Sequence, residues 1–236
     1  MNLTNEYGQP TGAAMPDWQP RPMPQRVTLD GHYCRLEPLT VAHASALFSA
    51  YQAWGDGRSY TYLFRAPDKT VEEFTAWVAS VCELADPLHF AVIDKKSGAP
   101  AGTLALMRID AQHGAMEVGH VHFSPLMTGT PVSSEAQWLL MRYAFDTLGY
   151  RRYEWKCNSL NAPSRRAALR LGFTFEGRFR QALVVKGHSR DTDWFAIIDS
   201  DWPAIDRALQ RWLAADNFSA DGKQRRTLES WRTDNK

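Results

Sequence analysis

The spacing of apolar residues predicts several helices along the chain. In "TVAHASALFSAYQAW" (residues 40–54), apolar residues recur at helical spacing behind Thr40, which we expect to be the N-cap. A longer apolar stripe runs over residues 131–148 and stops at Gly149. Asn161 is expected to cap a short helix, "APSRRAALRL", which Gly172 closes. Further helices are expected over residues 71–84 and 202–213.

Alternating and continuous apolar stretches predict the strands. "LHFAVID" and "AGTLALMRID" are joined by "KKSGAP", whose Gly and Pro indicate a hairpin turn, and "GAMEVGHVHFS" follows the next turn. These segments predict three consecutive antiparallel strands. Further strands are expected over residues 32–39, 151–158, 173–185 and 191–198.

The order of these elements predicts the fold class. Hairpins at both ends and alternating strands and helices in the middle indicate an α/β fold with a mixed, mostly antiparallel central sheet and flanking helices. Residues 115–175 are expected to contribute its parallel part.

The length of 236 residues fits one large domain with extensions. The first 26 residues hold five prolines and little periodic apolar character, which predicts an extended arm over residues 1–26. We expect the main domain to span residues 27–214 and a polar tail to span residues 215–236.

Net charge, hydrophobicity and cysteine content indicate which binding partners and which cellular compartment to expect. Lys and Arg number 27 against 26 Asp and Glu, so no overall field favours nucleic acid. No apolar stretch is long enough to span a membrane, and the N-terminus does not resemble an export signal. Cys34, Cys82 and Cys157 lie far apart and are read as free thiols, which suits a reducing cytoplasm. We therefore expect a soluble cytoplasmic protein, either a monomer or a homodimer.

The stretch "FSPLMTGTPVSSEAQWLLMRYAF" (residues 123–145) contains a loop of small residues before a helix. One interpretation is a well-formed helix start, with Thr130 as the cap and Pro131 at the first helical position. The other is an anion site, because the amides of Gly129, Thr130, Val132 and Ser133 are available beside a positively polarised helix end. The loop alone does not decide between them.

Three blocks of sequence carry a resemblance to a known family: "MEVGHVHFSP", "GTPVSSEAQWLLMRYAFDTLGYRRYEWKC" and "NAPSRRAALRLGFTFEG". Over residues 35–202 the chain resembles the GCN5-related N-acetyltransferases (GNAT), in the branch that includes the ribosomal-protein Nα-acetyltransferases. The family's pyrophosphate loop usually reads Gln-x-x-Gly-x-Gly/Ala. Here Leu126 replaces the Gln and Pro131 replaces the second small residue, so Gly129 alone is kept.

The resemblance implies a binding mode for acetyl-CoA and no metal. The cofactor would lie between the strands at residues 117–124 and 153–158, splayed apart to admit it, with the backbone of His122, Phe123 and Ser124 binding its amides. The amide of Asn161 would hold the pantetheine, although capping alone would account for this residue. Arg165 and Arg166 would reach the 3′-phosphate, although paired arginines on a helix are also typical of a solvated face.

Two residues are candidates for proton transfer. Glu117 is the candidate base, because it is the only polar residue of "AMEVG" and partial burial would raise its pKa. The alternative is a solvated or ion-paired strand residue. Ser164 is the candidate acid, since it matches the serine of the Asn-x-x-Ser branch, and Ala168 stands where many relatives have tyrosine. Its alternative is a capping role.

Other polar and aromatic residues have less specific readings. His120 and His122 lie two apart on one strand, but no third metal ligand is suitably spaced. Cys157 is read as apolar filling and not as a nucleophile. Trp54, Tyr60 and Tyr62 belong to a loop that commonly forms a wall of the acceptor cleft in this fold, and they are candidate acceptor contacts.

The sequence thus favours an acetyl-CoA-dependent N-acetyltransferase that moves the acetyl group directly to a primary amine. The acceptor stays open between a protein or peptide N-terminus and a small amine. A non-catalytic module that binds CoA or acyl-CoA is the alternative, and a structural role without cofactor is a third hypothesis.

Overall fold

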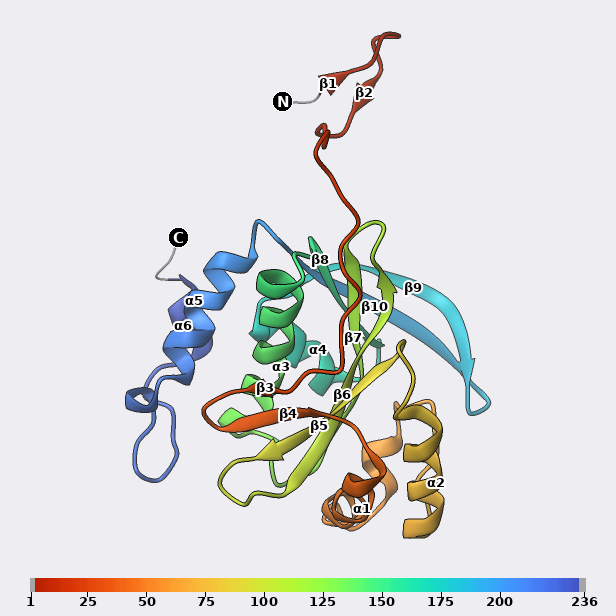
Figure 1. Cartoon of the computed structure of the whole chain (residues 1–236), viewed down its shortest axis with the longest axis vertical. Helices are drawn as coiled ribbons and strands as arrows, with labels where there is room; N and C mark the ends of the chain where they lie inside the picture. The colour runs from red at the N-terminus through yellow and green to blue at the C-terminus, as the bar shows by residue number, and fades with distance from the viewer. Residues whose placement is uncertain (1–2, 234–236) are drawn as a thin grey trace.

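The structure, a computed structural model, describes residues 3–233, with an eight-stranded sheet at its centre (Figure 1). The strand order is β3-β4-β5-β6-β7-β8-β10-β9, and every neighbouring pair is antiparallel except β7 and β8. The strands are β3 (Leu29–Asp30), β4 (Cys34–Pro38), β5 (Leu88–Asp94), β6 (Pro100–Asp110), β7 (Ala115–Phe123), β8 (Arg152–Asn158), β9 (Thr174–Val185) and β10 (His188–Ile198).

Helices cover both faces of this sheet. They are α1 (Ala44–Gln52), α2 (Val71–Val81), α3 (Pro131–Arg142), α4 (Ala162–Leu171), α5 (Trp202–Leu213) and α6 (Leu228–Thr233). Short 3₁₀ turns are η1 (Val41–His43), η2 (Gly57–Tyr60) and η4 (Ala215–Asn217), and α3 continues as a π-helical turn, η3 (Tyr143–Thr147). The predicted mixed, mostly antiparallel α/β fold is confirmed, as are the helices expected over residues 131–148, 162–171 and 202–213.

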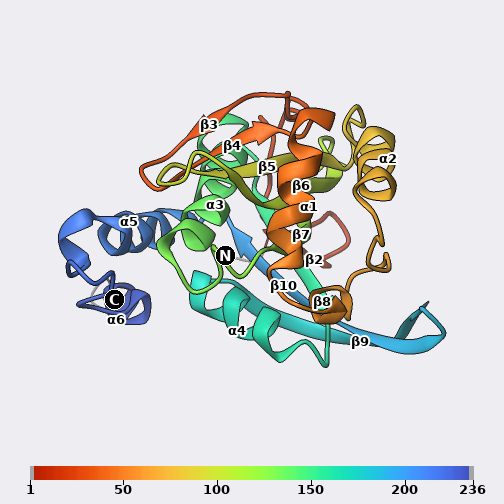
Figure 2. The ribbon, with the colours of Figure 1, turned by 90° about the horizontal axis from the view of Figure 1, so that it is seen from below.

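Alternation along the strands divides the core into two parts. In β5, Leu88, Phe90 and Val92 belong to a large cluster that includes apolar residues of α3, α4 and α5. Ala91 and Ile93 belong to a second cluster with residues of α1 and α2. Because neighbouring residues of a strand point to opposite faces, α1 and α2 cover one face and α3, α4 and α5 the other (Figure 2).

The parallel part of the sheet is smaller than the sequence indicates. β7 and β8, which are connected through α3, form one parallel pair of strands. β9 does not pair with β8, because β10 inserts between them and is antiparallel to both. The chain over residues 115–175 therefore contributes one parallel pair instead of a continuous parallel segment.

Segments of the N-terminal arm and of the C-terminal tail contact the domain. Trp18 donates its indole N–H to the carbonyl of Gln112 (3.0 Å), and the Tyr150 hydroxyl donates to the carbonyl of Pro22 (3.2 Å), so the second half of the arm lies against the sheet. Only the β1 (Leu3–Thr4) and β2 (Pro10–Thr11) hairpin projects away (Figure 1). At the other end, the expected polar tail contains α6, whose Leu228 is 1% exposed. Leu228 and Trp231, two apolar residues in a polar stretch, are too weak a signal to predict this helix.

A buried carboxylate joins α3 to the turn before β4. Glu135 is 1% exposed, and its oxygens accept the backbone N–H groups of His32 (2.8 Å), Tyr33 (2.7 Å) and Cys34 (2.7 Å). A Cβ added to Gly31 would lie 2.5 Å from the same carboxylate, so glycine is needed for this close approach.

We predict that Glu135→Gln lowers the free energy of unfolding by about 2–4 kcal/mol, since the amide has one acceptor oxygen and directs an NH₂ group at buried donors. Urea denaturation measures the change. The exposed Glu229→Gln on α6 is the control and should stay within about 0.5 kcal/mol of the parent. Equal stability of the two variants would contradict the role given to Glu135.

Candidate active site

The two parallel strands separate in the middle of the sheet. β7 and β8 pair from Ala115 with Arg152 to Val118 with Trp155, and no pairing between them continues beyond these residues. β7 stays with β6 as far as Phe123, and β8 stays with β10 as far as Asn158. An extra residue in β7 between Gly119 and His122 forms a bulge, with His120 at φ 49°. The splayed strands expected from the sequence are confirmed, and we call this opening the split.

Glu117 lies beside the start of the split and is 5% exposed. Its Oε2 atom is 2.8 Å from Nζ of Lys156 and 3.3 Å from Nε of Arg108. Lys156 also contacts Glu154 (2.7 Å), and its Nζ lies 3.8 Å from the centroid of the Trp194 ring. Glu117 is therefore both buried and ion-paired, which combines the two alternatives left open by the sequence.

The two carboxylates that share Lys156 differ in pKa. Burial raises the pKa of Glu117, and Lys156 and Arg108 offset this only in part. Burial acts in the same direction on Glu154, but hydrogen bonds from Lys156 and Arg152 lower its pKa overall. The two pKa values differ because Nε of Arg152 lies 2.7 Å from Glu154, whereas Nε of Arg108 lies 3.3 Å from Glu117. Glu117 is thus the carboxyl group of this cluster that holds a proton more readily.

Ser164 lies on the other face of the sheet. Its Oγ accepts the indole N–H of Trp155 (3.0 Å), and its backbone N–H donates to Oδ1 of Asn161 (3.2 Å). Because Oγ accepts from Trp155, the hydroxyl proton is left to donate, and the Ser164 hydroxyl acts to lower the pKa of the nearby Cys157 thiol. Burial is the largest effect on Cys157 and raises its pKa, as expected for a thiol that fills apolar space. The predicted cap by Asn161 is confirmed.

The loop before α3 differs in detail from the expectation. Thr130 occupies the N-cap position but does not cap: its Oγ1 donates to the carbonyl of Met127 (2.7 Å), and its N–H donates to the same carbonyl (3.2 Å). The amide of Thr130 is therefore less available to a ligand than predicted. Val132 and Ser133 lie in the first turn, where N–H groups have no intrahelical acceptor. Gly129 adopts φ 76°, with open space beside its Cα.

The arginines of α4 differ from the expectation that Arg165 and Arg166 reach the 3′-phosphate. Arg165 forms an ion pair with Asp193 (2.8 Å), a fully buried carboxylate that also pairs with Arg178 (2.6 Å). Arg165 is therefore held by the protein, whereas Arg166 is exposed. Arg170, which the sequence reading passed over, donates to Oγ of Ser134 (2.9 Å) and so brings a cation to the first turn of α3.

The end of β7 is tied to the loop after α1. The His122 ring stacks on Tyr51 (3.8 Å between centroids) and meets Tyr60 edge-on (4.5 Å). Burial lowers the pKa of His122 to about 3, so the ring is neutral at physiological pH. The carbonyl of Phe123 accepts the indole N–H of Trp54 (3.2 Å). Ser124 donates its N–H to the carbonyl of Ala101 (3.0 Å), while its buried Oγ has no hydrogen-bond partner among residues 3–233.

The loop also reaches β8. The hydroxyl of Tyr62 donates to the carbonyl of Leu160 (3.1 Å), just after the end of this strand. Trp54, Tyr60 and Tyr62 thus contact residues at the ends of both splayed strands, on the face that carries α1 and α2.

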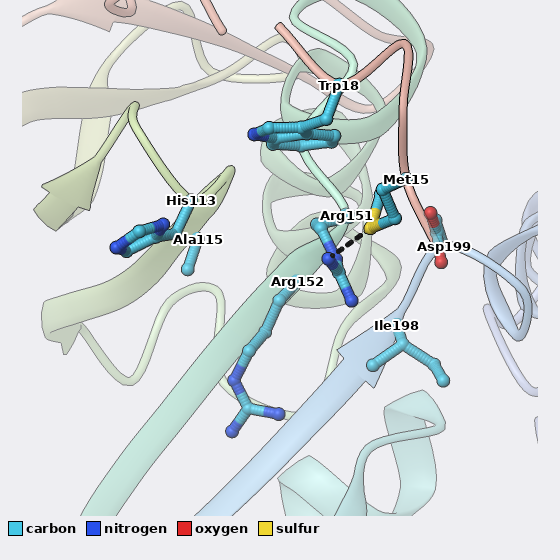
Figure 3. A pocket seen from close by; sticks show the side chains of 8 residues that line it. All are labelled: Met15, Trp18, His113, Ala115, Arg151, Arg152, Ile198 and Asp199. Atoms are coloured by element: carbon cyan, nitrogen blue, oxygen red, sulfur yellow. Dashed lines mark hydrogen bonds between the residues drawn. The ribbon is translucent and has the colours of Figure 1, made fainter. Parts of the chain in front are cut away.

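Other sites can be placed relative to the split. A cavity of about 520 Å³ lies at the opposite end of the parallel pair, where Ala115 and Arg152 begin β7 and β8 (Figure 3). Met15 and Trp18 of the arm form part of its wall, and no predicted site residue lines it.

Within residues 3–233 no three His, Cys, Asp or Glu side chains are arranged to hold a metal ion. In the same range no helix has the length and hydrophobicity needed to cross a bilayer.

Comparisons with known proteins agree with this geometry. A family model described as an acetyltransferase (GNAT) domain matches residues 34–174. A GCN5-related N-acetyltransferase structure from Brucella melitensis is 50% identical with a TM-score of 0.91, covering 93% of this chain and all of that one. The chain therefore belongs to the GNAT acetyltransferase family, and it is an N-acetyltransferase.

Two more distant relatives indicate how far the likeness extends. "Uncharacterized N-acetyltransferase p20" of Bacillus licheniformis is 26% identical over 154 residues, which are 64% of this chain and 86% of that protein. The ribosomal-protein-S5-alanine acetyltransferase structure from Vibrio fischeri has a TM-score of 0.61 at 18% identity, covering 75% of this chain and 98% of that one. The latter likeness shows the fold alone.

We predict that Lys156→Met lowers the free energy of unfolding by about 3 kcal/mol at pH 7, because the buried Glu117 and the partly buried Glu154 lose a shared cation. Without Lys156 their pKa values rise, so the ionised forms are penalised at neutral pH. The penalty should shrink as the pH falls through these raised values and the carboxylates become neutral. Denaturation at pH 7 and pH 5 measures it. The control is exposed Lys223→Met; a pH-independent loss in Lys156→Met would contradict the electrostatic explanation.

Proposed function

We propose that the protein transfers the acetyl group of acetyl-CoA directly to a primary amine. The observation that carries this proposal is that Glu117 and Ser164, the two candidates for proton transfer, lie on opposite faces of the split. Glu117 shares the face of Lys156 and Trp194, and Ser164 lies with Trp155 on the face of α4. An amine entering from one face can thus meet a thioester held from the other.

Several groups fit acetyl-CoA in the split. The buried Oγ of Ser124 lacks a partner at the end of β7, and the first-turn N–H groups of Val132 and Ser133 suit a phosphate group. The backbone of His122 and Phe123 and the side chain of Asn161 complete the proposed binding site, with Gly129 allowing the backbone a close approach. Arg170 is a better candidate for phosphate contact than Arg165, which pairs with Asp193.

The residues at the split have distinct proposed roles. Acetyl-CoA supplies a thioester whose C–S bond breaks as the new C–N bond forms. Glu117 accepts the proton that the amine loses, directly or through a water, and its raised pKa suits a base. Ser164 provides a proton for the leaving sulfur. Lys156 and Arg108 fix the position of the Glu117 carboxylate.

The acceptor is a primary amine, either a protein or peptide N-terminus or a small molecule. Trp54, Tyr60 and Tyr62 are proposed to form a wall of its cleft. The Asn-x-x-Ser helix supports the ribosomal-protein branch. We further propose that the protein works in the cytoplasm without a metal, as a monomer or homodimer, and that neither nucleic acid nor membrane is a partner.

A CoA-binding module without turnover is a second candidate, favoured by Leu126, Pro131 and Ala168, which depart from the family's pattern. Both candidates predict that acetyl-CoA at 100 times its Kd stabilises the fold by about 2.7 kcal/mol. Thiol release with a panel of amines, with mass spectrometry for the added acetyl group, separates them. Stabilisation without acetyl transfer to any amine would favour the module.

We predict that Glu117→Gln lowers kcat by about 10²- to 10⁴-fold, because the amide cannot accept the proton, with little change in acetyl-CoA affinity. Steady-state kinetics and acetyl-CoA titration give the two quantities. Glu37→Gln is the matched control, since Glu37 is an ion-paired strand carboxylate in β4, away from the split. Unchanged kcat in Glu117→Gln would remove Glu117 from the mechanism.

The raised pKa of Glu117 predicts the acidic limb of the pH profile. The base works when ionised, so kcat should rise with pH through a midpoint above the ordinary carboxyl value of 4.5. Because the free amine also titrates, the profile is measured with two acceptors of different amine pKa. A limb that follows the amine alone, or that persists in Glu117→Gln, would contradict this assignment.

A further inference from the structure

Arg190 of β10 is a buried cation without an anionic partner. The side chain is only 7% exposed, and its guanidinium lies 4.9 Å from the centroid of the Phe64 ring. Its one hydrogen bond to a described residue runs from Nε to Oγ1 of Thr192 (3.3 Å), and no carboxylate in residues 3–233 forms an ion pair with it. Among the described residues, the fully buried side-chain atoms without a hydrogen-bond partner include none of Arg190, so its remaining N–H groups reach solvent and are available to a ligand.

Neighbouring arginines show that the fold supplies carboxylates elsewhere. Arg152 pairs with Glu154 and Glu176, and Arg165 and Arg178 share the buried Asp193. Arg190 is more buried than these residues and lacks such a partner. This contrast indicates that the partner of Arg190 comes from outside the chain.

The strand register places Arg190 on the acceptor face. Thr192 lies opposite Asn158 and Trp194 lies opposite Lys156, so both lie on the face that carries Lys156, and the hydrogen bond from Nε of Arg190 to Oγ1 of Thr192 holds Arg190 on that face. This is also the face of Glu117. The α3 terminus and α4, where the cofactor phosphates are proposed to bind, cover the opposite face. An anion that reaches Arg190 therefore arrives with the acceptor.

Two hydrogen bonds join the elements that surround Arg190. The hairpin between β9 and β10 folds onto the loop after α1, where Nζ of Lys186 donates to the carbonyl of Tyr60 (2.6 Å). Tyr62 joins the same loop to Leu160 at the end of β8 (3.1 Å). Arg190 follows this hairpin turn and packs on Phe64 of the loop. Because Arg190 is only 7% exposed, it is partly shielded from water, which strengthens a charge-assisted hydrogen bond with a carboxylate.

We propose that the acceptor is an amine that also carries a carboxylate, which Arg190 binds as a planar, two-point ion pair while the amine meets Glu117. This inference rests on the proposed transferase function and specifies its substrate class. The carboxylate can belong to a free amino acid or to an acidic residue at the start of a peptide, and both present the same chemistry to Arg190.

The first test needs no variant. Acetyl transfer is measured with free amino acids and their carboxamides, and with peptides that carry Asp or Glu at the second position and matched Asn or Gln peptides. We expect kcat/KM to be about 100-fold higher for the carboxylate member of at least one series. The series that shows the preference identifies the source. Equal rates, or a preference for the uncharged members, would overturn the proposal.

Arg190→Gln supplies the second test. It should lower kcat/KM for the preferred carboxylate acceptor by about 100-fold, mainly through KM, and leave the uncharged acceptor unchanged; Arg190→Lys should recover part of the loss. Exposed Arg180→Gln on β9 is the control. An equal loss on both acceptors would indicate a structural role and overturn the proposal. If no amine is acetylated, the transferase function itself fails; if only uncharged amines are, this inference alone fails.

Discussion

The separation of β7 from β8 is the constraint on which the rest of the structure depends. Each strand has two edges, and beyond Val118 and Trp155 each keeps only its outer partner: β6 holds β7, and β10 holds β8. The bulge at His120 turns β7 away at this point. Backbone groups facing the opening have lost a strand partner, and buried backbone groups need another acceptor or donor. The carbonyls of His122 and Phe123 already accept from Tyr51 and Trp54, and the amides of the proposed acetyl-CoA would meet other backbone groups along the opening.

The ties at the end of β7 keep the opening from closing. Tyr51 donates its hydroxyl to the carbonyl of His122 (3.0 Å) and stacks on the His122 ring, while Trp54 donates to the carbonyl of Phe123. These contacts come from α1 and the loop after it, so the helix pair α1–α2 does more than cover a hydrophobic face. The helix pair and its loop hold the end of β7 in place, and they position Trp54, Tyr60 and Tyr62 beside the ends of the two splayed strands.

Buried charge is arranged locally although the net charge is only +1. Three backbone N–H groups stabilise the Glu135 carboxylate through hydrogen bonds. Two arginines form ion pairs with Asp193, and Lys156 and Arg108 form ion pairs with Glu117. Glu135 and Asp193 connect elements that are distant in the sequence and are structural. The Glu117 cluster and Arg190 lie beside the split on one face, which gives that face the charged groups needed to receive a polar acceptor.

Local patterns determined the individual elements. Helical spacing located α2, α3, α4 and α5, since each buries one apolar stripe, and the side chain of Asn161 and the positive φ of Gly172 start and end α4 as expected. The KKSGAP turn correctly predicted the β5–β6 hairpin. The alternation of Glu154, Trp155 and Lys156 placed two charges on one face, a signal that the sequence reading did not use.

Long-range pairing decided what no local pattern contains. The insertion of β10 between β8 and β9 left one parallel pair, the parallel register brought Glu117 to Lys156, and Asp193 took Arg165. The sequence by itself thus determined the elements, their caps and the family resemblance, because these follow from residues close together in the chain. Only the tertiary structure decided which charges pair and that, within the described residues, the buried Arg190 pairs with no carboxylate, because burial and partners are set by contacts between distant strands.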